Sequence, residues 1–399
     1  MECKLGDICR PKQWKTVATS ELSDKGYPVY GANGKIGYYK EYNHKNSTIL
    51  VTCRGATCGK INISDPFSYV NGNAMALDDL NSAVEFGYLL YFLKNRDFSD
   101  IITGSAQPQI IKSSIEKVKI LLPPINEQKR IVEKLDAILP KVKQTKERLE
   151  NISTILKRFR QSVLVAAFDG RLTGTTISKK EKLEELCYFI TKGTTPKEMA
   201  SGKGEIPFIK VYNLTFTGAL DFTLDPTFVS RKTHDSFLAR SKVVPGDILM
   251  NIVGPPLGKV SLLPDSFGEA NINQAIVRFR CKDLLSNKYL LYFLLNQETI
   301  ETITAQSKAT VGQNNLTLEI CRNIEIPLTS IDKQQEIVCR VEKLFAVADA
   351  LEEKYQSAMS RVNKIEQAVL AKAFRGELAE ADPDDESAEE LLDGILGDK

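Results

Sequence analysis

Two glycine-flanked loops carry the residues best suited to phosphate chemistry. Gly55-Ala-Thr-Cys-Gly59-Lys60 and Gly254-Pro-Pro-Leu-Gly258-Lys259 approach the pattern of a phosphate-cradling loop, but each has one residue too few between its glycines. Ile61 and Val260 also stand where such a loop carries the serine or threonine that holds magnesium. We therefore predict a tight turn leaving a strand, with Lys60 and Lys259 free to contact phosphate.

Other chemically suggestive residues lack the partners that catalysis needs. The segment Gly254–Leu257 has the two prolines of an amino-methyltransferase motif, but neither the side-chain acceptor before them nor the aromatic ring after them. His44 and His234 are the only histidines, and no paired carboxylates or cysteines stand near them in the sequence. Cys53 and Cys58 lack a second pair, so the eight cysteines indicate buried thiols in a reducing compartment rather than zinc ligands. We expect no catalytic site, metal or cofactor in this chain.

Charge is divided unevenly along the chain. The net charge of +2 is the sum of −9 in the segment Glu377–Lys399 and +11 in the remainder. A basic body with an acidic tail is compatible with a polyanionic partner. No run of 18 apolar residues occurs, and Met1–Lys4 begins no apolar stretch, so we expect a cytoplasmic protein that does not contact membranes.

An internal repeat must position these loops. The hexapeptide Tyr-Leu-Leu-Tyr-Phe-Leu occurs at Tyr88–Leu93 and again at Tyr289–Leu294. From Gln107 to Leu172 the two copies match at a constant offset of 206 residues. The offset is only 179 at Pro28 and grows to 199 at Ile49, so the second copy should hold about 20 extra residues between Ile209 and Ile248.

We predict that each repeat forms one mixed α and β globular part followed by one long helix. Ser47–Thr52 and Ala275–Arg280 are the clearest strands, and both hexapeptides have the helical spacing of core residues. The fold class that follows is α+β, with two mixed α/β domains separated by two long helices. The expected segments are a first globular domain at 1–123, a first helix at 124–172, a second globular domain at 173–328, a second helix at 329–378 and an acidic tail at 379–399.

The two helices carry a coiled-coil seam, because apolar residues alternate by four and three over nearly five heptads. The first seam is Ile131, Leu135, Ile138, Val142, Thr145, Leu149, Ile152, Leu156, Phe159 and Val163, and the second is Ile337, Val341, Leu344, Ala348, Leu351, Tyr355, Ala358, Val362, Ile365 and Val369. Pro140 should kink or interrupt the first helix, which we expect at Ile125–Phe168.

The simplest way to bury both seams is against each other. The link from Gly170 to Lys180 is short, so the second globular part should begin near the far end of the first helix. The second helix then runs back from that end, which favours an antiparallel coiled coil and a pseudo-two-fold arrangement of the repeats.

The repeat borders resemble the specificity subunit of type I restriction-modification enzymes. The resemblance rests on Leu122-Pro-Pro-Ile-Asn-Glu-Gln128 at the start of the first helix, on Leu156-Lys-Arg-Phe-Arg-Gln161 within it, and on Ala167-Phe-Asp-Gly-Arg-Leu172 at its exit. The exit recurs at Ala373–Leu378, whereas Thr329-Ser330 replaces the two prolines in the second copy. The order of segments along nearly the whole chain is that of the family.

This resemblance implies a DNA-reading subunit without catalytic activity of its own. Each globular part would be a target recognition domain for one half of a split double-stranded DNA site, and the helices would fix the gap. Two modification subunits with S-adenosylmethionine would dock on this chain, and two motor-nuclease restriction subunits with ATP and magnesium would complete the complex. Because the two domains differ in sequence, the half-sites should differ and the target should be asymmetric.

Polar and basic residues in the predicted loops are the candidates for DNA contact, with Lys and Arg on phosphate and amides at base edges. They are Asn33, Lys35, Arg54, Lys60, Gln107 and Gln109 in the first domain, and Lys210, Asn213, Lys259, Lys308, Gln313, Asn314 and Asn315 in the second. Each could instead be a solvated loop residue. Gln107 and Gln313 occupy matched positions, where they either meet DNA or brace the structure that follows.

Two other functions and two states of the tail stay open at this stage. The chain could be a coiled-coil scaffold without DNA readout, or a DNA methyltransferase or nuclease acting alone. The tail places Ala388, Leu391, Leu392, Ile395 and Leu396 on one helical face, so it either docks on a partner subunit or remains solvated.

Overall fold

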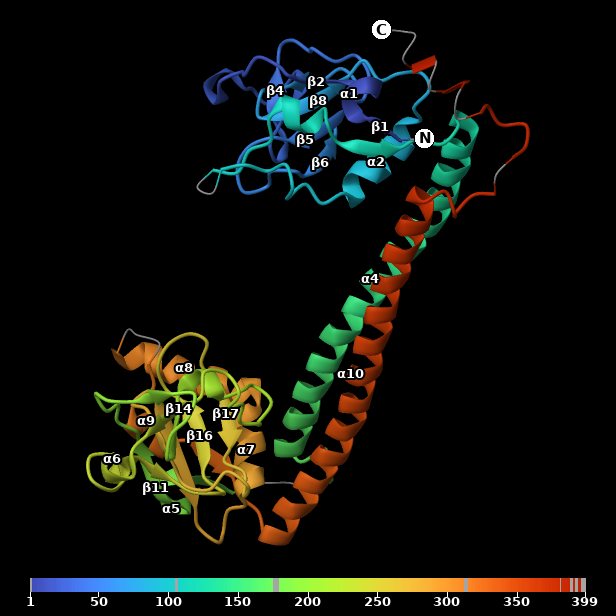
Figure 1. Ribbon diagram of the computed structural model, residues 1–399. Coiled ribbons are helices and arrows are strands. Elements are labelled where there is room, and N and C mark those ends of the chain that lie inside the picture. Colours follow the sequence, from blue (N-terminus) through green and yellow to red (C-terminus); the bar gives the residue numbers. More distant parts are fainter. Residues whose placement is uncertain are drawn as a thin grey trace. The chain divides into compact units, whose positions relative to one another are not determined.

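The computed structural model describes residues 2–104, 107–174, 179–311, 315–380, 382–387, 390–391 and 394–395 (Figure 1). The chain divides into two compact units. Unit 1 comprises Met1–Arg148 and Ala358–Lys399, and unit 2 comprises Leu149–Ser357. Two helices of 44 residues each, α4 (Ile125–Phe168) and α10 (Ile331–Phe374), contribute one part to either unit.

Unit 1 contains a four-stranded antiparallel sheet in the order β2-β8-β5-β6 and a three-stranded sheet in the order β4-β3-β7, in which β3 and β7 run parallel. A further pair, β1 and β9, joins the two ends of the globular part. The strands are β1 (Glu2–Lys4), β2 (Arg10–Gln13), β3 (Tyr27–Gly31), β4 (Gly34–Tyr39), β5 (Ile49–Thr52), β6 (Ile61–Ile63), β7 (Tyr69–Val70), β8 (Ala74–Asp78) and β9 (Lys119–Leu121). The helices are α1 (Leu5–Ile8), the 3₁₀ turn η1 (Thr19–Glu21), α2 (Phe86–Asn95) and α3 (Lys112–Ile115).

Alternation along the central strands of unit 1 buries both faces of the larger sheet. Ile49 and Val51 of β5 pack into a core with Leu89 and Leu93 of α2, whereas Leu50 packs on the opposite face against Tyr30 of the smaller sheet. Successive residues of a strand point to opposite faces, so a run of apolar residues predicts a strand covered on both sides. The prediction of a strand at Ser47–Thr52 is confirmed.

Unit 2 repeats this plan with more elements. Its sheets have the orders β11-β19-β16-β17 and β12-β14-β13-β18-β15, and β10 pairs with β20 as β1 does with β9. The strands are β10 (Lys180–Lys182), β11 (Cys187–Lys192), β12 (Ala200–Ser201), β13 (Ile206–Ile209), β14 (Thr227–Val229), β15 (Lys242–Val243), β16 (Ile248–Asn251), β17 (Val260–Leu262), β18 (Ala270–Ile272), β19 (Ile276–Cys281) and β20 (Glu325–Pro327). The helices are α5 (Leu183–Leu186), η2 (Val211–Asn213), α6 (Arg231–Asp235), η3 (Ala239–Ser241), α7 (Asn287–Leu295), α8 (Gln297–Val311) and α9 (Leu318–Arg322).

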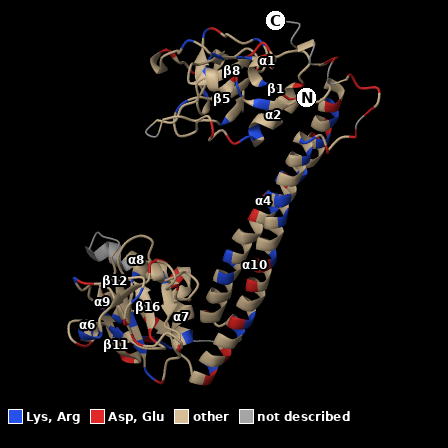
Figure 2. Ribbon diagram, viewed as in Figure 1, with Lys and Arg blue, Asp and Glu red and all other residues tan. Residues whose placement is uncertain are grey.

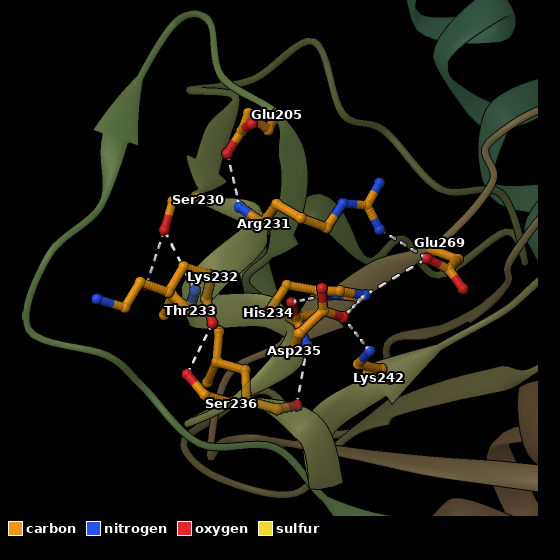
Figure 3. A network of polar contacts seen from close by, with 12 residues as sticks. Glu205, Ser230, Arg231, Lys232, Thr233, His234, Asp235, Ser236, Lys242 and Glu269 are labelled. Atoms are coloured by element: carbon orange, nitrogen blue, oxygen red, sulfur yellow. Dashed lines mark hydrogen bonds and ion pairs between the residues drawn. The ribbon is translucent and has the colours of Figure 1, made fainter.

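The extra residues of the second copy enlarge the second sheet of unit 2. Between Ile209 and Ile248 the chain holds β14, which pairs with β13 as β4 does with β3, and adds α6 and β15, as the change in repeat offset predicts. Polar contacts hold α6 in place (Figure 3): the Arg231 backbone N–H donates to Glu205 Oε2 at 2.6 Å, and Lys242 Nζ lies 2.5 Å from Asp235 Oδ1. The insertion is therefore an ordered part of the second domain.

The long helices pair antiparallel in both units. In unit 1, Lys134 Nζ donates to the Leu378 carbonyl at 2.9 Å, and Lys146 forms an ion pair with Glu366. In unit 2, Arg160 Nη2 lies 2.9 Å from Asp349 Oδ1. Partner numbers fall along α10 as they rise along α4, which confirms the antiparallel pairing of the predicted α+β fold.

The seam is buried by more than the partner helix. Ile131 and Leu135 lie in the core of unit 1 beside α2, and Ile337 and Val341 lie in the core of unit 2 beside α7. The remaining predicted seam residues range from Ala348, which is 0% exposed, to Ile152, Leu351 and Ile365, which are 37%, 47% and 51% exposed. The prediction that the two seams bury each other did not include the domain cores, which also cover part of each seam. Heptad spacing predicts an apolar stripe, but it does not predict which neighbour covers it.

Helix α4 is continuous at Pro140, so the expected interruption is absent. The Pro140 side chain lies on the exposed face, while the neighbouring Leu135 and Leu139 pack on the core of unit 1. Packing on the rest of the unit supports a helix that has lost one backbone donor.

The described residues of the tail pack on the chain's own first unit. Leu391 and Ile395 are 2% and 1% exposed in the core of unit 1, a state that differs from both docking on a partner subunit and solvation. The predicted face also included Ala388, Leu392 and Leu396, which lie outside the described residues.

Candidate nucleic-acid interface

Three loops converge at one edge of unit 1, beyond the ends of β3, β5 and β8. The Thr57 hydroxyl donates to Asn33 Oδ1 at 2.9 Å, which joins the β5–β6 turn to the β3–β4 turn. The Gly55 backbone N–H donates to the Pro108 carbonyl at 3.0 Å, which joins the same turn to the segment before α3. The structure thus brings together Asn33, Arg54 and Gln109, which are far apart in the sequence.

The basic side chains of this edge are exposed. Within the described part of unit 1, no carboxylate forms an ion pair with Arg54 or Lys60. Lys35 Nζ lies 4.3 Å from the centre of the Tyr38 ring, and the hydrogen bond with the Tyr38 hydroxyl raises the pKa of Lys35 above its usual value. Lys35, Arg54 and Lys60 are therefore exposed side chains that an anionic ligand can reach.

The β5–β6 and β16–β17 loops are hairpin turns. Gly55 and Gly59 have φ values of +89°, and Gly254 and Gly258 have φ values of +82° and +96°. Glycine adopts this left-handed backbone conformation at little cost in free energy, because it has no Cβ. A second strand follows each loop, whereas a phosphate-cradling loop leads into a helix, so the prediction of a tight turn leaving a strand is confirmed.

Unit 2 forms the equivalent edge. The Leu316 N–H donates to the Ile252 carbonyl at 2.8 Å, as Ile110 does to Cys53 at 3.0 Å in unit 1. Asn315 Oδ1 accepts from the Gly254 N–H at 3.3 Å, so Asn315 braces the turn. Lys259 Nζ lies 5.9 Å from the centre of the Phe216 ring, and Lys210 Nζ lies 5.6 Å from that of Tyr212.

The prediction that the Asn213 side chain contacts DNA is wrong. Its side chain is buried, with Oδ1 accepting from the Lys210 N–H at 2.9 Å and Nδ2 donating to the carbonyls of Asp221 and Leu224 at 3.0 Å each. A carboxamide occupied in this way shapes the loop and is not available to a base edge. Gln313, Asn314 and the side chain of Lys308 lie outside the described residues.

The two glutamines of the first-domain loop differ in environment. Both side chains are exposed, and the backbone of Gln109 exchanges hydrogen bonds of 2.8 and 2.9 Å with Thr103. The structure gives no contact by which the Gln107 side chain braces α3, within the part of unit 1 that it describes. Base contact therefore remains the prediction for Gln107.

Sequence reasoning missed Gln13 at this edge. Gln13 is the last residue of β2, and its Nε2 lies 2.9 Å from Cys53 Sγ and 3.0 Å from the Gly72 carbonyl. Lys12 Nζ lies 3.5 Å from the centre of the neighbouring Trp14 ring. The repeat could not reveal these residues, because the two copies have different sequences in this strand.

Both histidines form hydrogen bonds with neighbouring side chains. His44 Nε2 lies 2.8 Å from Asp78 Oδ1 and its Nδ1 lies 2.7 Å from Asn43 Oδ1, so the fold brings one carboxylate that is distant in the sequence beside it. Since both ring nitrogens are engaged, neither is placed to accept a proton from a nucleophile. His234 is buried, and its Nδ1 lies 2.7 Å from Asn271 Oδ1.

The described residues include no cluster of three or more His, Cys, Asp or Glu side chains arranged to hold a metal ion. Within the same residues, no helix combines the length and apolar character needed to cross a membrane.

Basic residues are dense on the middle of α4 (Figure 2): seven lysines and arginines and two glutamates lie between Lys141 and Arg160.

The family model for the type I restriction modification DNA specificity domain matches residues 1–154 and 178–359, which is more than half of the chain. The chain belongs to this family. The two matched regions together cover both globular parts and most of both long helices, so the repeat seen in the sequence is a repeat of the family's domain.

Relatives in this specificity family are moderately similar. The chain is 36% identical over 286 residues to the type I restriction enzyme EcoBI specificity subunit of Escherichia coli, a match covering 66% of this chain and 59% of that one. It is 32% identical over 309 residues to the EcoKI specificity subunit of Escherichia coli K12, covering 73% and 65%. The matches thus span about three fifths of these relatives. The EcoDI subunit of Escherichia coli is 28% identical over 414 residues, covering 92% of this chain and 89% of that one.

Solved structures share the fold of this specificity-family chain. A chain from a study of complex assembly and conformational transition of the type I R-M system has a TM-score of 0.75 at 18% identity, covering 95% of this chain and 98% of that one. The HsdS subunit from Thermoanaerobacter tengcongensis has a TM-score of 0.54 at 19% identity, covering 95% and 97%.

Proposed function

We propose that this chain is the sequence-reading subunit of a type I restriction-modification complex, in which each globular domain recognises one half of an asymmetric bipartite DNA site. The observation that carries the proposal is the matched pair of loop edges. The β5–β6 and β16–β17 turns occupy equivalent places in two copies of one fold, but they present different side chains. Equivalent placement with different chemistry suits two related but unequal half-sites.

The polar and basic groups proposed at these edges suit the division of labour in DNA recognition. Lys35, Arg54, Lys60, Lys210 and Lys259 would contact phosphates and set the register, whereas amide side chains would read base edges. The amide candidates are Asn33, Gln107, Gln109, Gln313 and Asn314; Asn315 was predicted with them, but its Oδ1 braces the β16–β17 turn. A basic edge also attracts the duplex over some distance, because several cations of one sign add their fields.

The long helices would set the gap between half-sites and hold the catalytic partners. Apolar side chains that face solvent on the helices of unit 2 support docking: Ile155, Val347 and Leu351 are 60%, 56% and 47% exposed. Ile155 lies on α4 and the other two on α10, and exposed apolar groups that form a patch are typical of protein interfaces. Two modification subunits, supplied with S-adenosylmethionine, would bind there, and two restriction subunits with ATP and magnesium would complete the complex in the cytoplasm. The chain itself would have no catalytic role.

The test is to express the chain with its modification subunits in a host without other methyltransferases and to sequence the methylome. The proposal expects one asymmetric bipartite motif with a fixed gap, and a gel shift with purified subunits that favours this motif. Complete methylation without a shared motif, or binding that favours no sequence, would support a scaffold. Methyl transfer by the purified chain alone would establish an independent methyltransferase.

The docking surface has its own test. Ile155→Glu places a charge where an apolar contact is expected, so co-purification with the modification subunits should be lost while the thermal unfolding of the free chain is unchanged. Asn151→Glu is the matched control, because Asn151 is an exposed polar residue on the same helix. Equal co-purification of both variants would rule out this part of the surface.

A further inference from the structure

Two glutamines, 206 residues apart, make the same three hydrogen bonds in the two units. Gln128 is 0% exposed; its Oε1 accepts from the Glu85 N–H at 2.8 Å, and its Nε2 donates to the carbonyls of Ala83 at 2.9 Å and Pro123 at 2.8 Å.

Gln334 is also 0% exposed. Its Oε1 accepts from the Ser286 N–H at 2.9 Å, and its Nε2 donates to the carbonyls of Leu284 and Thr329, each at 2.9 Å. The side chain thus occupies in unit 2 the place that Gln128 occupies in unit 1.

The bonds connect the globular domain to its long helix. Glu85 and Ser286 are the residues that cap the N-termini of α2 and α7, the helices of the repeated hexapeptide. Pro123 and Thr329 lie just before α4 and α10. Each carboxamide therefore joins the loop before a domain helix to the first turn of a long helix, within one unit.

The residue type is specified by these partners. The site offers one donor and two acceptors, all backbone groups, and a carboxamide is the side chain that supplies one acceptor and two donors in a planar arrangement. The surroundings differ between the copies, since prolines precede α4 where Thr329 and Ser330 precede α10. The glutamine and its geometry are the same in both, so the arrangement does not depend on the neighbouring sequence.

Apolar packing at the same junction leaves the direction of the helix open. Ile131 and Leu135 of α4 contact the core of unit 1, but apolar contact is not directional. Hydrogen bonds fix distance and angle, because they weaken steeply away from their preferred geometry. The glutamine is a buried side chain that supplies this direction with the same geometry at both junctions, beside the exposed contacts Tyr91–Asp136 and Lys288–Glu342.

We propose that Gln128 and Gln334 are positioning residues that fix the angle between each recognition domain and its long helix, and thereby the gap between half-sites that the chain accepts. The inference rests on the proposed function. In this inference the glutamines do not contact DNA, because they act through the orientation of the domains. The bases would be contacted by the loops around the β5–β6 and β16–β17 turns.

The experiment uses the full chain with its modification subunits and the variants Gln128→Met and Gln334→Met, which keep the side-chain length and remove the hydrogen bonds. Gln144→Met and Gln335→Met are the matched controls, because Gln144 and Gln335 are exposed on the same two helices. Binding is measured on duplexes with the methylome-defined half-sites separated by the preferred gap, by one base pair more and by one base pair less.

Either variant should bind the preferred duplex about tenfold more weakly, the order of one lost hydrogen bond, while its preference over the two altered gaps shrinks by a similar factor. The penalty for a mismatched base in a half-site should stay at the wild-type value, as should all results for the controls. A lower melting temperature with an unchanged gap profile would show a purely structural role and overturn the inference.

Where a methionine variant fails to fold, Gln→Glu at the same position keeps the oxygen acceptor and removes the two N–H donors. A reduced gap preference again supports the inference, and a lower melting temperature with an unchanged gap profile overturns it. The wild-type chain separates this inference from the proposed function. A wild type without any gap preference refutes the proposed function itself. A wild type with a sharp gap preference that the variants retain refutes only the role of the glutamines.

Discussion

Shortening both long helices by one heptad should shorten the gap between the recognised half-sites. The change removes residues 142–148 of α4 and residues 363–369 of α10, which face each other around the Lys146–Glu366 ion pair. Removing seven residues from each keeps the heptad phase, because an α-helix drifts only about 20° per heptad. Each domain keeps its own contacts with the helix ends.

The magnitude follows from helix geometry. Seven residues at ~1.5 Å per residue shorten each helix by roughly 10 Å, and one base pair rises about 3.4 Å, so the gap should lose up to about three base pairs. The loss is smaller where the helix axis is inclined to the DNA. Three base pairs also turn the duplex by roughly 100°, since one turn holds about 10.5 base pairs, so affinity for the new site should fall.

Methylome sequencing of a host that expresses the shortened chain measures the result directly. Both half-sites should be unchanged and the gap should be shorter. The control keeps both heptads and carries Lys143→Ala with Gln367→Ala, two exposed positions within them, and should retain the wild-type motif. An unchanged or longer gap in a shortened chain that still methylates DNA would refute the idea that the helices set the spacing.

Three further predictions concern the tail and the β16–β17 loop of unit 2. Leu391→Ala should lower the free energy of unfolding by about 2–5 kcal/mol in chemical denaturation, because Leu391 is 2% exposed, whereas the exposed control Glu386→Ala should change it by less than about 0.5 kcal/mol. The hydrogen bond from Arg130 lowers the pKa of Asp385, so its stabilising effect is present above the unfolded pKa and is lost as the pH falls through the folded pKa. Asp385→Asn should therefore lower the melting temperature near pH 7, and the difference from the wild type should shrink as the pH falls through the lowered pKa of Asp385; a constant difference across pH would contradict this. Lys259→Ala should weaken binding to all duplexes alike and reduce the slope of log affinity against log salt by about 0.9, and an altered base preference would argue against a phosphate contact.

The architecture could be predicted well because it depends on patterns that repeat. The 206-residue offset, the seam spacing and the hexapeptides predicted both long helices, including the bounds Ile125–Phe168, and the site of the insertion in the second domain. Periodicity and duplication report backbone geometry and the existence of an apolar face. These are properties of single elements, so one sequence is enough to reveal them.

Side-chain partnerships were harder to predict, because they join residues distant in sequence. Asn213 looked like a DNA contact, but its three hydrogen bonds all lie inside one loop. His44 and Asp78 are 34 residues apart and meet only when β8 pairs with β5. Gln128 and Gln334 were visible as matched positions, but their role required the backbone groups around them.

Each domain is completed by a helix end from the other repeat, which has a consequence for synthesis. The Phe374 ring packs against Tyr88 and Phe92 of the first domain at 5.6 and 5.5 Å, and Phe168 packs against Tyr289 of the second domain at 5.0 Å. The ribosome delivers Phe168 before the second domain, but it delivers Phe374 almost three hundred residues after Tyr88. The half of the chain made first therefore completes its folding only after α10 has been synthesised, and the apolar face of α2 lacks its contact with Phe374 until then.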